Sequence, residues 1–408
     1  MSSLTDAATR GLLVIAIAAI AVATLVPTEA HSMGTAFCIL CGRRGLADFL
    51  CNVLLFAPFG FALCISDRSL RWAALAGLSF SVLIEAAQLN LVAGRDSNIG
   101  DVLANTLGAV AGWFAASSRG WWLASVVPRR RAAGVSAATA VVLVTALVTF
   151  MPSLPRGEWY MQWTARFGNM AHYEGNVLST TFDALDVPGD SQIEMMDSVR
   201  HLLTRAPLHV SATAALPGHL APIVSIYDGE QREIMLLGAD RTNFVYRYRM
   251  IANDLELDHG ELRVENAFSG LTAGQPFYLT LNVDRRRWCL EVGQRRECGA
   301  GFTVGDTWGL LMSPDWPAAV IAFMRVFWIW LVFLPAGLLV RSRPAYALTC
   351  LAVLPLLLVG PLLIGFAATP LPQLAAALAG LASGALVAPR LRHQSASLSS
   401  VSDIGLKV

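Results

Sequence analysis

The sequence predicts a polytopic α-helical membrane protein of about eight transmembrane helices, with an all-β domain inserted between the fifth and the sixth helix. Of its 408 residues 55% are hydrophobic and 14% are charged, whereas soluble domains average about 25% charged residues. Long runs without charge occupy both ends of the chain, while residues 158–315 are charged, aromatic and β-patterned. This shift in composition marks a soluble domain between two membrane blocks.

Eight apolar runs are each near or somewhat below the ~20 residues that cross a bilayer as a helix. They cover residues 11–27, 48–66, 72–92, 100–116, 133–150, 318–340, 345–367 and 371–388, of which the last is short and weakly apolar. The first run, with Arg10 before it, could instead be a cleaved signal peptide. Residue 31 lies outside the cell in either case.

Arginine placement gives the orientation, because cytoplasmic loops are enriched in arginine and lysine. The arginines that fall on one side of the predicted membrane are Arg10, Arg68, Arg71, Arg119, Arg129, Arg130, Arg131, Arg341, Arg343, Arg390 and Arg392. Arg43, Arg44 and Arg95 are the exceptions and would lie outside. We therefore expect both termini to be cytoplasmic and the β domain to be extracytoplasmic.

These observations divide the chain into six parts. They are a cytoplasmic N-terminus (1–10), a four-helix membrane domain (11–131), a fifth helix with its linker (132–155), the β domain (156–316), three further helices (317–389) and a disordered cytoplasmic tail (390–408). A net charge of +1, without a basic face, argues against nucleic acid as a partner. The bilayer is the expected partner.

The stretch from Leu83 to Gly112 holds more polarity than two membrane helices and a loop need. Gly77, Ser81, Glu85 and Gln88 form one stripe of the third helix, small residues first and polar ones after. Ionisable groups cost about 2.5–3.5 kcal/mol each at mid-bilayer, which makes them functional candidates by default. Arg95, in the following loop, is the obvious partner for Glu85.

The second and fourth helices add polar groups at the same depth. Asp48 and Asn52 share one helix face, and Asp101 and Asn105 share another. Gly108 and Gly112 continue the latter face as a GxxxG pattern, which is typical of closely packed membrane helices. We expect a pocket open to the outside between helices two, three and four; the alternative is a hydrogen-bond network that only holds the helices together.

About a third of the chain, residues 10–130, resembles the VanZ-like membrane family. The resemblance rests on Asn52-Val-Leu-Leu-Phe-Ala-Pro-Phe-Gly60, Ile84-Glu85 with Gln88, Arg95, and Asp101-Val-Leu-Ala-Asn105-Thr-Leu-Gly108. It implies a bacterial cytoplasmic (inner) membrane location, a link to resistance to the glycopeptide teicoplanin, and binding residues, but no reaction. The residues it carries over are Asp48, Asn52, Glu85, Gln88, Arg95, Asp101 and Asn105, with Asp96 and Asn98 matched less specifically.

Four of the cysteines suggest disulfides in an oxidising compartment. Cys38 and Cys41 form a CxxC pair, which could be a redox dithiol, half of a zinc site or a local disulfide; we favour a structural disulfide or unreactive thiols. In a hairpin with a type II′ turn at Gly293-Gln294, Cys289 faces Cys298 on a non-hydrogen-bonded pair, which suits a disulfide. Free buried thiols are the alternative.

Residues 156–316 contain many short alternating runs separated by Gly, Pro, Asp and Asn, which predict a sandwich or barrel. Their order resembles the concanavalin A-like and laminin G-like jelly-roll sandwich, a fold that often binds sugar. Residues available for a sugar site are Trp159, Trp163, Tyr173, Tyr227, Asp228, Asp240, Asp254 and Asp258. Most aromatics in a sandwich are core, and no paired-carboxylate glycosidase signature is present.

Two functions remain in competition, and a transporter ranks behind both. The first is a cell-envelope protein that binds a glycan or a lipid-linked cell-wall component. The second is a membrane enzyme on a lipid- or glycan-linked substrate, with Glu85 or Asp101 as acid or base and Arg95 on a phosphate or carboxylate. The sequence leans away from an enzyme and predicts no cofactor and no metal.

Overall fold

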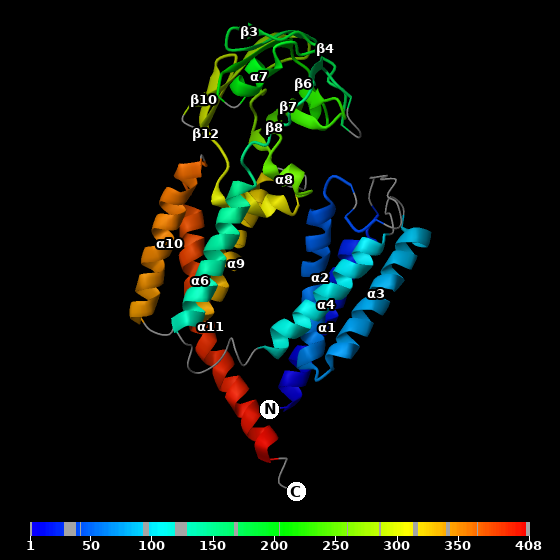
Figure 1. The fold of residues 1–408 in the computed structure, drawn as a ribbon, viewed down its shortest axis with the longest axis vertical. Helices are drawn as coiled ribbons and strands as arrows, with labels where there is room; N and C mark the ends of the chain where they lie inside the picture. The colour runs from blue at the N-terminus through cyan, green and yellow to red at the C-terminus, as the bar shows by residue number, and fades with distance from the viewer. Residues whose placement is uncertain are drawn as a thin grey trace.

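The computed structural model places two groups of helices side by side beneath a β-rich region (Figure 1). It describes residues 2–27, 38–40, 42–92, 98–118, 129–166, 170–203, 205–258, 260–284, 287–312, 317–339, 343–364 and 366–404. Helices occupy all eight predicted apolar ranges. In the described residues four are long and apolar enough to cross a bilayer (α2, α3, α4 and α9), and the others contribute shorter apolar segments.

The first helical group is built on a close contact between two helices. It comprises α1 (Ser2–Leu25), α2 (Gly45–Ile65), α3 (Leu70–Leu91) and α4 (Ile99–Ser117). A Cβ atom at Gly112 would lie 1.8 Å from the carbonyl oxygen of Ala57, and one at Gly60 would lie 1.8 Å from that of Ala109. The predicted GxxxG face is therefore the face on which α4 meets α2.

The second helical group repeats this device with residues that the sequence reading passed over. It comprises α6 (Arg129–Val148), α9 (Ala318–Leu339), α10 (Arg343–Ile364) and α11 (Leu371–Ile404). A Cβ atom at Gly337 would lie 2.2 Å from the carbonyl oxygen of Leu381, and one at Gly384 would lie 2.4 Å from that of Leu334. Gly380 and Gly384 form a second GxxxG pair, which joins α11 to α9.

The β region consists of two six-stranded antiparallel sheets. The first sheet has the order β4 (Ser191–Gln192), β1 (Trp159–Trp163), β6 (Ala221–Asp228), β7 (Glu233–Asp240), β8 (Asn243–Tyr248), β9 (Leu262–Val264). The second has the order β12 (Arg295–Ala300), β11 (Arg287–Val292), β10 (Pro276–Asp284), β5 (Leu208–Thr213), β2 (Val177–Phe182), β3 (Leu185–Asp186). Short helices α7 (Met196–Leu202), α8 (Ile251–Asp254) and the 3₁₀ helix η1 (Val304–Leu310) complete it.

The two sheets share one hydrophobic core, which continues into the second helical group. Tyr246 of β8 packs on Trp288 of β11 with ring centroids 4.8 Å apart. At the base of the β region the ring of Phe150 packs on those of Phe302 and Phe366, with centroid distances of 5.0 and 5.5 Å. Alternation of apolar residues along the strands thus produces a two-sheet domain that packs directly on helices.

The hairpin of β11 and β12 has the predicted register and disulfide. Val292 pairs with Arg295, and Cys289 pairs with Cys298 at a Cα–Cα distance of 4.0 Å. Gly293 has a φ of +60° and Gln294 does not have a positive φ, as a type II′ turn requires. The disulfide is formed, and the alternative of free thiols at these two positions is wrong.

The last helix is longer than expected. Residues 390–404, which we expected to be disordered, continue α11 to Ile404. This segment contains Leu, Arg, Gln and Ala, all of which tolerate or favour helix.

Candidate functional site

Polar side chains of α2, α3 and α4 meet near the end of the first helical group that faces the β region. We call this set the polar cluster. It consists of Asn52, Ser81, Glu85, Gln88, Asn98, Asp101 and Asn105.

The cap of α4 forms the first part of the cluster. Asn98 caps the helix by accepting a hydrogen bond from the backbone N–H of Asp101 at 2.9 Å, and its own amide donates to Asp101 Oδ2 at 2.9 Å. Asn52 of α2 donates to Asp101 Oδ1 at 2.6 Å. Both carboxylate oxygens of Asp101 are therefore engaged, and they connect α2 with the start of α4.

Glu85 brings α3 into the same network. Glu85 is a buried residue of α3, and its Oε2 accepts a hydrogen bond from the backbone N–H of Asn98 at 3.0 Å. A buried carboxylate is stable only when it is hydrogen-bonded or paired. A negative charge beside the first turn of α4 is also favoured by the helix dipole.

Asn105 lies one turn deeper and uses only half of its amide. Its Nδ2 donates to Ser81 Oγ of α3 at 2.8 Å. Its Oδ1 has no hydrogen-bond partner in the described residues, although the residue is 1% exposed. A buried acceptor without a donor costs about 1–3 kcal/mol.

Gln88 shows the same asymmetry. Its Nε2 donates to the backbone carbonyl of Thr24 in α1 at 2.9 Å. Its Oε1 is buried and lacks a partner within the part of the chain that the structure describes, and the residue is 7% exposed. We call Gln88 and Asn105 the open amides, because each keeps one acceptor unused.

Asp48, at the start of α2, forms an ion pair with an arginine. Arg44, four residues earlier, lies 3.7 Å from Asp48 and 3.2 Å from the buried Asp258 of the β region. Arg44 also donates to the carbonyl oxygen of Leu311 at 3.2 Å. The start of α2 is thus in contact with the β region. Arg95 and Asp96 lie outside the described residues.

The loop before α2 contacts the start of α4. The backbone N–H of Gly100 donates to the carbonyl oxygen of Cys38 at 3.2 Å. A Cβ atom at Gly100 would lie 2.1 Å from the carbonyl oxygen of Ile39, so only glycine fits. Cys38 is disulfide-bonded, and Cys41 lies outside the described residues.

The residues considered for a sugar site in the β region are mostly structural. Trp159 and Tyr173 are buried in the core, and burial raises the pKa of Tyr173 to about 12. The four aspartates all form ion pairs with arginines: Asp228 with Arg232, Asp240 with Arg263, Asp254 with Arg249 and Asp258 with Arg44. They are therefore used in folding the domain.

Asp228 shows how completely such a carboxylate is engaged. It accepts hydrogen bonds from the backbone N–H groups of Glu230 and Arg232 at 3.0 Å, and from Arg232 Nε at 2.8 Å. Burial alone would raise its pKa, but these donors outweigh burial and hold the pKa below its ordinary value.

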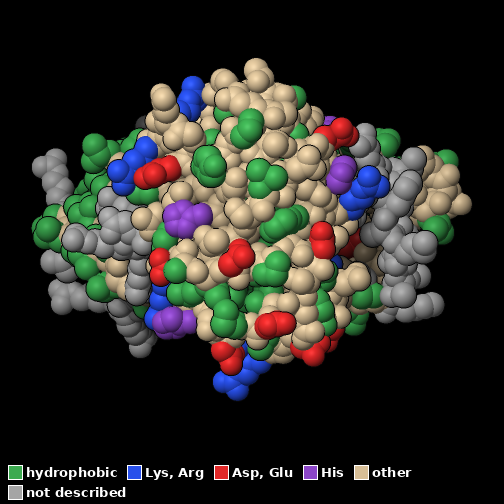
Figure 2. Space-filling model, turned by 90° about the horizontal axis from the view of Figure 1, so that it is seen from above, with side chains coloured by type: hydrophobic (Ala, Val, Ile, Leu, Met, Phe, Trp, Pro, Cys, Tyr) green, Lys and Arg blue, Asp and Glu red, His purple; other side chains and the backbone are tan. Residues whose placement is uncertain are grey.

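The outer face of the β region does not gather carboxylates into one patch. Seen from above, acidic side chains and histidines are scattered among neutral ones (Figure 2). Tyr278 of β10 is an exposed aromatic that the sequence reading missed, beside a hydrogen bond between His209 Nδ1 and Thr280 Oγ1 at 3.0 Å. Strand alternation could have found it, because it lies between the core residues Phe277 and Leu279.

Comparison with known proteins identifies one part of the chain. Residues 12–123 match the VanZ/LLP1 family model. No curated protein and no solved structure matches the chain. The matched range contains α2, α3, α4 and every member of the polar cluster, so this part forms a VanZ-like domain, while the β region and the second helical group lie outside the match.

Proposed function

We propose that this chain is a protein of the bacterial cytoplasmic membrane whose VanZ-like domain binds a lipid-linked or glycan-bearing component of the cell envelope. The polar cluster would hold the polar part of that component at the outer membrane surface. The β region, a sandwich of the jelly-roll type in this proposal, would stand outside the membrane and contact the same envelope material.

The outer surface of the first helical group supports placement in a membrane. Large apolar side chains of α1 and α3 are exposed: Val14, Ile15, Leu83, Leu89 and Leu91. A soluble monomer rarely exposes so much contiguous apolar surface, and the lengths of α2, α3 and α4 suit a bilayer. The two helical groups would then share one membrane, with both termini in the cytoplasm.

The open amides carry the binding proposal. Oδ1 of Asn105 and Oε1 of Gln88 are buried acceptors that lack donors in the described part of the chain. A ligand that presents hydroxyl or amide N–H groups would satisfy both, and it would regain their desolvation cost. Sugars and peptides of cell-wall precursors present such donors.

An enzymatic role for Asp101 has less support. Its two oxygens accept hydrogen bonds from Asn52 and Asn98, which hold the carboxylate in a fixed position. A general acid or base needs one oxygen free to exchange a proton with substrate. Binding is therefore the better use of this geometry.

The proposal is tested by the teicoplanin sensitivity of a bacterial host that expresses the chain. Asn105→Ala, Glu85→Gln and Asp101→Asn should each abolish the change in sensitivity that the parent confers, with unchanged protein abundance. Asn90→Ala is the matched control, since Asn90 is an exposed asparagine of α3 that donates only to its own helix, at Ala86. Parallel loss of abundance in all three variants would show that the cluster serves packing alone.

A further inference from the structure

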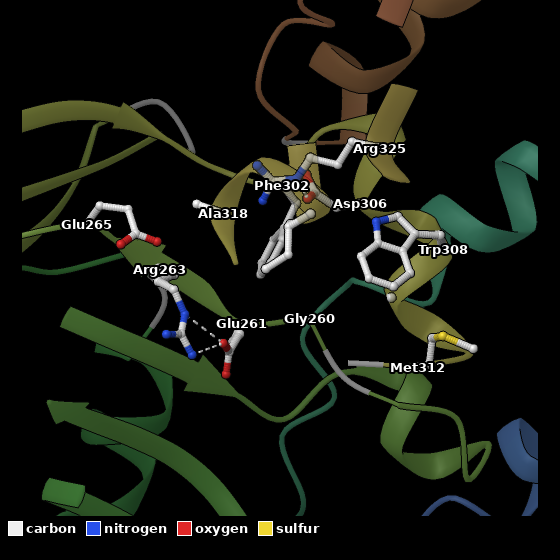
Figure 3. A pocket seen from close by; sticks show the side chains of 12 residues that line it. Gly260, Glu261, Arg263, Glu265, Phe302, Asp306, Trp308, Met312, Ala318 and Arg325 are labelled. Carbon is white, nitrogen blue, oxygen red and sulfur yellow. Dashed lines mark hydrogen bonds and ion pairs between the residues drawn. The ribbon is translucent and has the colours of Figure 1, made fainter. Parts of the chain in front are cut away.

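A cavity of about 180 Å³ lies where the β region meets the start of α9 (Figure 3). Its walls come from β9 and the residues beside it, from η1, and from the first two turns of α9. It shares no residue with the polar cluster. The side chains that matter below are Glu261, Arg263, Glu265, Trp308 and Arg325.

Arg263 belongs to the wall, and all three of its side-chain nitrogens donate to carboxylates of the protein. Its guanidinium contacts Glu261 at 2.8 Å and Asp240 at 2.5 Å. Burial lowers its pKa, but the two carboxylates outweigh burial and hold the pKa above the ordinary value. In formal charges this group of one arginine and two carboxylates carries one net negative charge, so it forms an acidic wall of the cavity.

Arg325 keeps capacity for a ligand. Its Nε pairs with Asp306 Oδ1 at 2.5 Å, and the other oxygen of Asp306 accepts from Thr303, from N–H at 2.6 Å and from the hydroxyl at 2.7 Å. The two Nη groups of Arg325 have no hydrogen-bond partner among the described residues, and the side chain is 44% exposed. Two adjacent Nη groups on one guanidinium can donate two parallel hydrogen bonds to a phosphate.

Glu265 is the complementary charge. It is exposed, and within the described ranges it takes part in no hydrogen bond or ion pair. Figure 3 shows Glu265 on one side of the cavity and Arg325 on the other, with the ring of Phe302 between them. Within the described residues the cavity thus has an arginine with two unpaired Nη groups on one side of the Phe302 ring and an unpaired carboxylate on the other.

The place of the cavity indicates the source of its ligand. α9 is a 22-residue helix with a mean hydropathy of 2.1, and Ala318, Ile321 and Arg325 of its first two turns line the cavity. Trp308 and Met312 add apolar surface. Tryptophan and arginine beside the end of an apolar helix are typical of the headgroup layer of a membrane.

We propose that this cavity binds the headgroup of a zwitterionic phospholipid, phosphatidylethanolamine. The phosphate contacts the Nη groups of Arg325. The ammonium contacts Glu265 and lies near the aromatic face of Phe302, where a cation is also attracted by the ring. The inference rests on the proposed membrane placement of α9, but not on any ligand of the polar cluster.

The test measures lipid retention by the full chain after detergent extraction from membranes. Delipidated protein is titrated with palmitoyl-oleoyl phosphatidylethanolamine, or with the phosphatidylglycerol of the same chains, and bound lipid is counted by native mass spectrometry. The parent should bind phosphatidylethanolamine about tenfold more tightly, which corresponds to 1.4 kcal/mol. Equal affinity for the two lipids would overturn the proposal.

Variants separate the two charges of the headgroup. Glu265→Gln should lower affinity for phosphatidylethanolamine about tenfold and leave that for phosphatidylglycerol unchanged, because only the former carries an ammonium. Arg325→Gln should weaken both, and Arg325→Lys, which keeps the charge beside Asp306, should fold and retain part of the binding. Unchanged phosphatidylethanolamine binding by Glu265→Gln would contradict the assignment.

Two controls make the outcome specific. Glu291→Gln and Arg296→Gln change an exposed ion pair on β11 and β12, at 2.9 Å, and should leave lipid binding unchanged. Free phosphoethanolamine should compete only weakly; competition equal to that of the lipid would mean a soluble ligand and would overturn the membrane source. Recovery of the chain without detergent, in the soluble fraction, would instead refute membrane placement itself.

Discussion

The two helical groups use the same packing device but treat buried amides differently. In both, a GxxxG pair lets one helix contact the backbone of another, α4 on α2 and α11 on α9. In the second group Gln373, 3% exposed, uses both ends of its amide: Oε1 accepts from the N–H of Gly305 at 2.9 Å, and Nε2 donates to Thr303 Oγ1 at 2.8 Å.

Within the described residues, the open amides of the first group, Gln88 and Asn105, use one end each. A buried amide with all its hydrogen bonds inside the protein serves folding, because each bond offsets the cost of desolvation. A buried amide with a spare acceptor has capacity for a molecule from outside. This difference in hydrogen bonding distinguishes a candidate binding site from a polar contact that only stabilises the fold. The number of polar residues does not make that distinction.

The largest expected effect tests the shared packing device. Gly112→Ala should destabilise the full chain in detergent by about 3 kcal/mol or more, because its Cβ would overlap the backbone of α2. Gly11→Ala is the matched control, since Gly11 is a helical glycine with nothing within 4 Å of an added Cβ. It should stabilise the chain by up to about 1 kcal/mol. Similar unfolding midpoints for the two variants would show that α2 and α4 are not in close contact.

The next effect tests the contrast between the amides. Gln373→Leu should cost about 2–4 kcal/mol, because it leaves the buried N–H of Gly305 without an acceptor and also removes the hydrogen bond that Thr303 Oγ1 accepts. Gln88→Leu should cost about 1 kcal/mol or less, because it removes one hydrogen bond together with a buried acceptor that has no donor among the described residues. Chemical unfolding in detergent measures both. An equal loss of unfolding free energy for the two variants would show that the two amides do not differ in their hydrogen bonding.

A smaller effect concerns a fully bonded carboxylate of the β region. Asp228→Asn should cost about 1–2 kcal/mol at pH 7, because the amide cannot accept the charge-assisted bonds of Arg232. The folded-state pKa of Asp228 lies below its ordinary value of 3.8, so its contribution is present above pH 3.8 and is lost as pH falls through the folded pKa.

Thermal unfolding between pH 7 and pH 2.5 measures this dependence. The parent and Asp228→Asn should converge towards the acid end of the range, while Asp186→Asn, a change at an exposed carboxylate of β3, should follow the parent throughout. A constant gap between the parent and Asp228→Asn at every pH would mean that the ionised form of Asp228 is not the one stabilised.

The sequence predicted the helices and the hairpin disulfide because both follow from local rules. Length and hydropathy mark α2, α3, α4 and α9, and turn geometry sets Cys289 opposite Cys298. It also predicted that residues from α2, α3 and α4 meet. Partners that depend on distant chain segments could not be found in this way. Arg44 beside Asp258 and Gln88 beside the carbonyl of Thr24 are two examples.

Two features had a signal in the sequence that was not used. Gly380 and Gly384 have GxxxG spacing, although the apolar run around them is short and weakly apolar. Asp48 and Asn52 are four residues apart, but Arg44 is four residues before Asp48 and offers it an opposite charge. Spacing alone shows which residues share a helix face, and it does not show which of them form a hydrogen bond or an ion pair.

The central claim is that the open amides accept hydrogen bonds from a ligand, and direct binding tests it. The full chain in detergent is titrated with a polyprenyl-diphosphate-linked disaccharide–pentapeptide, and the ligand-induced rise in unfolding temperature is measured. The parent should be stabilised, Asn105→Ala and Gln88→Ala should lose most of that stabilisation, and Asn90→Ala should keep it. Equal stabilisation of the parent and both open-amide variants, or none in the parent, would contradict the claim.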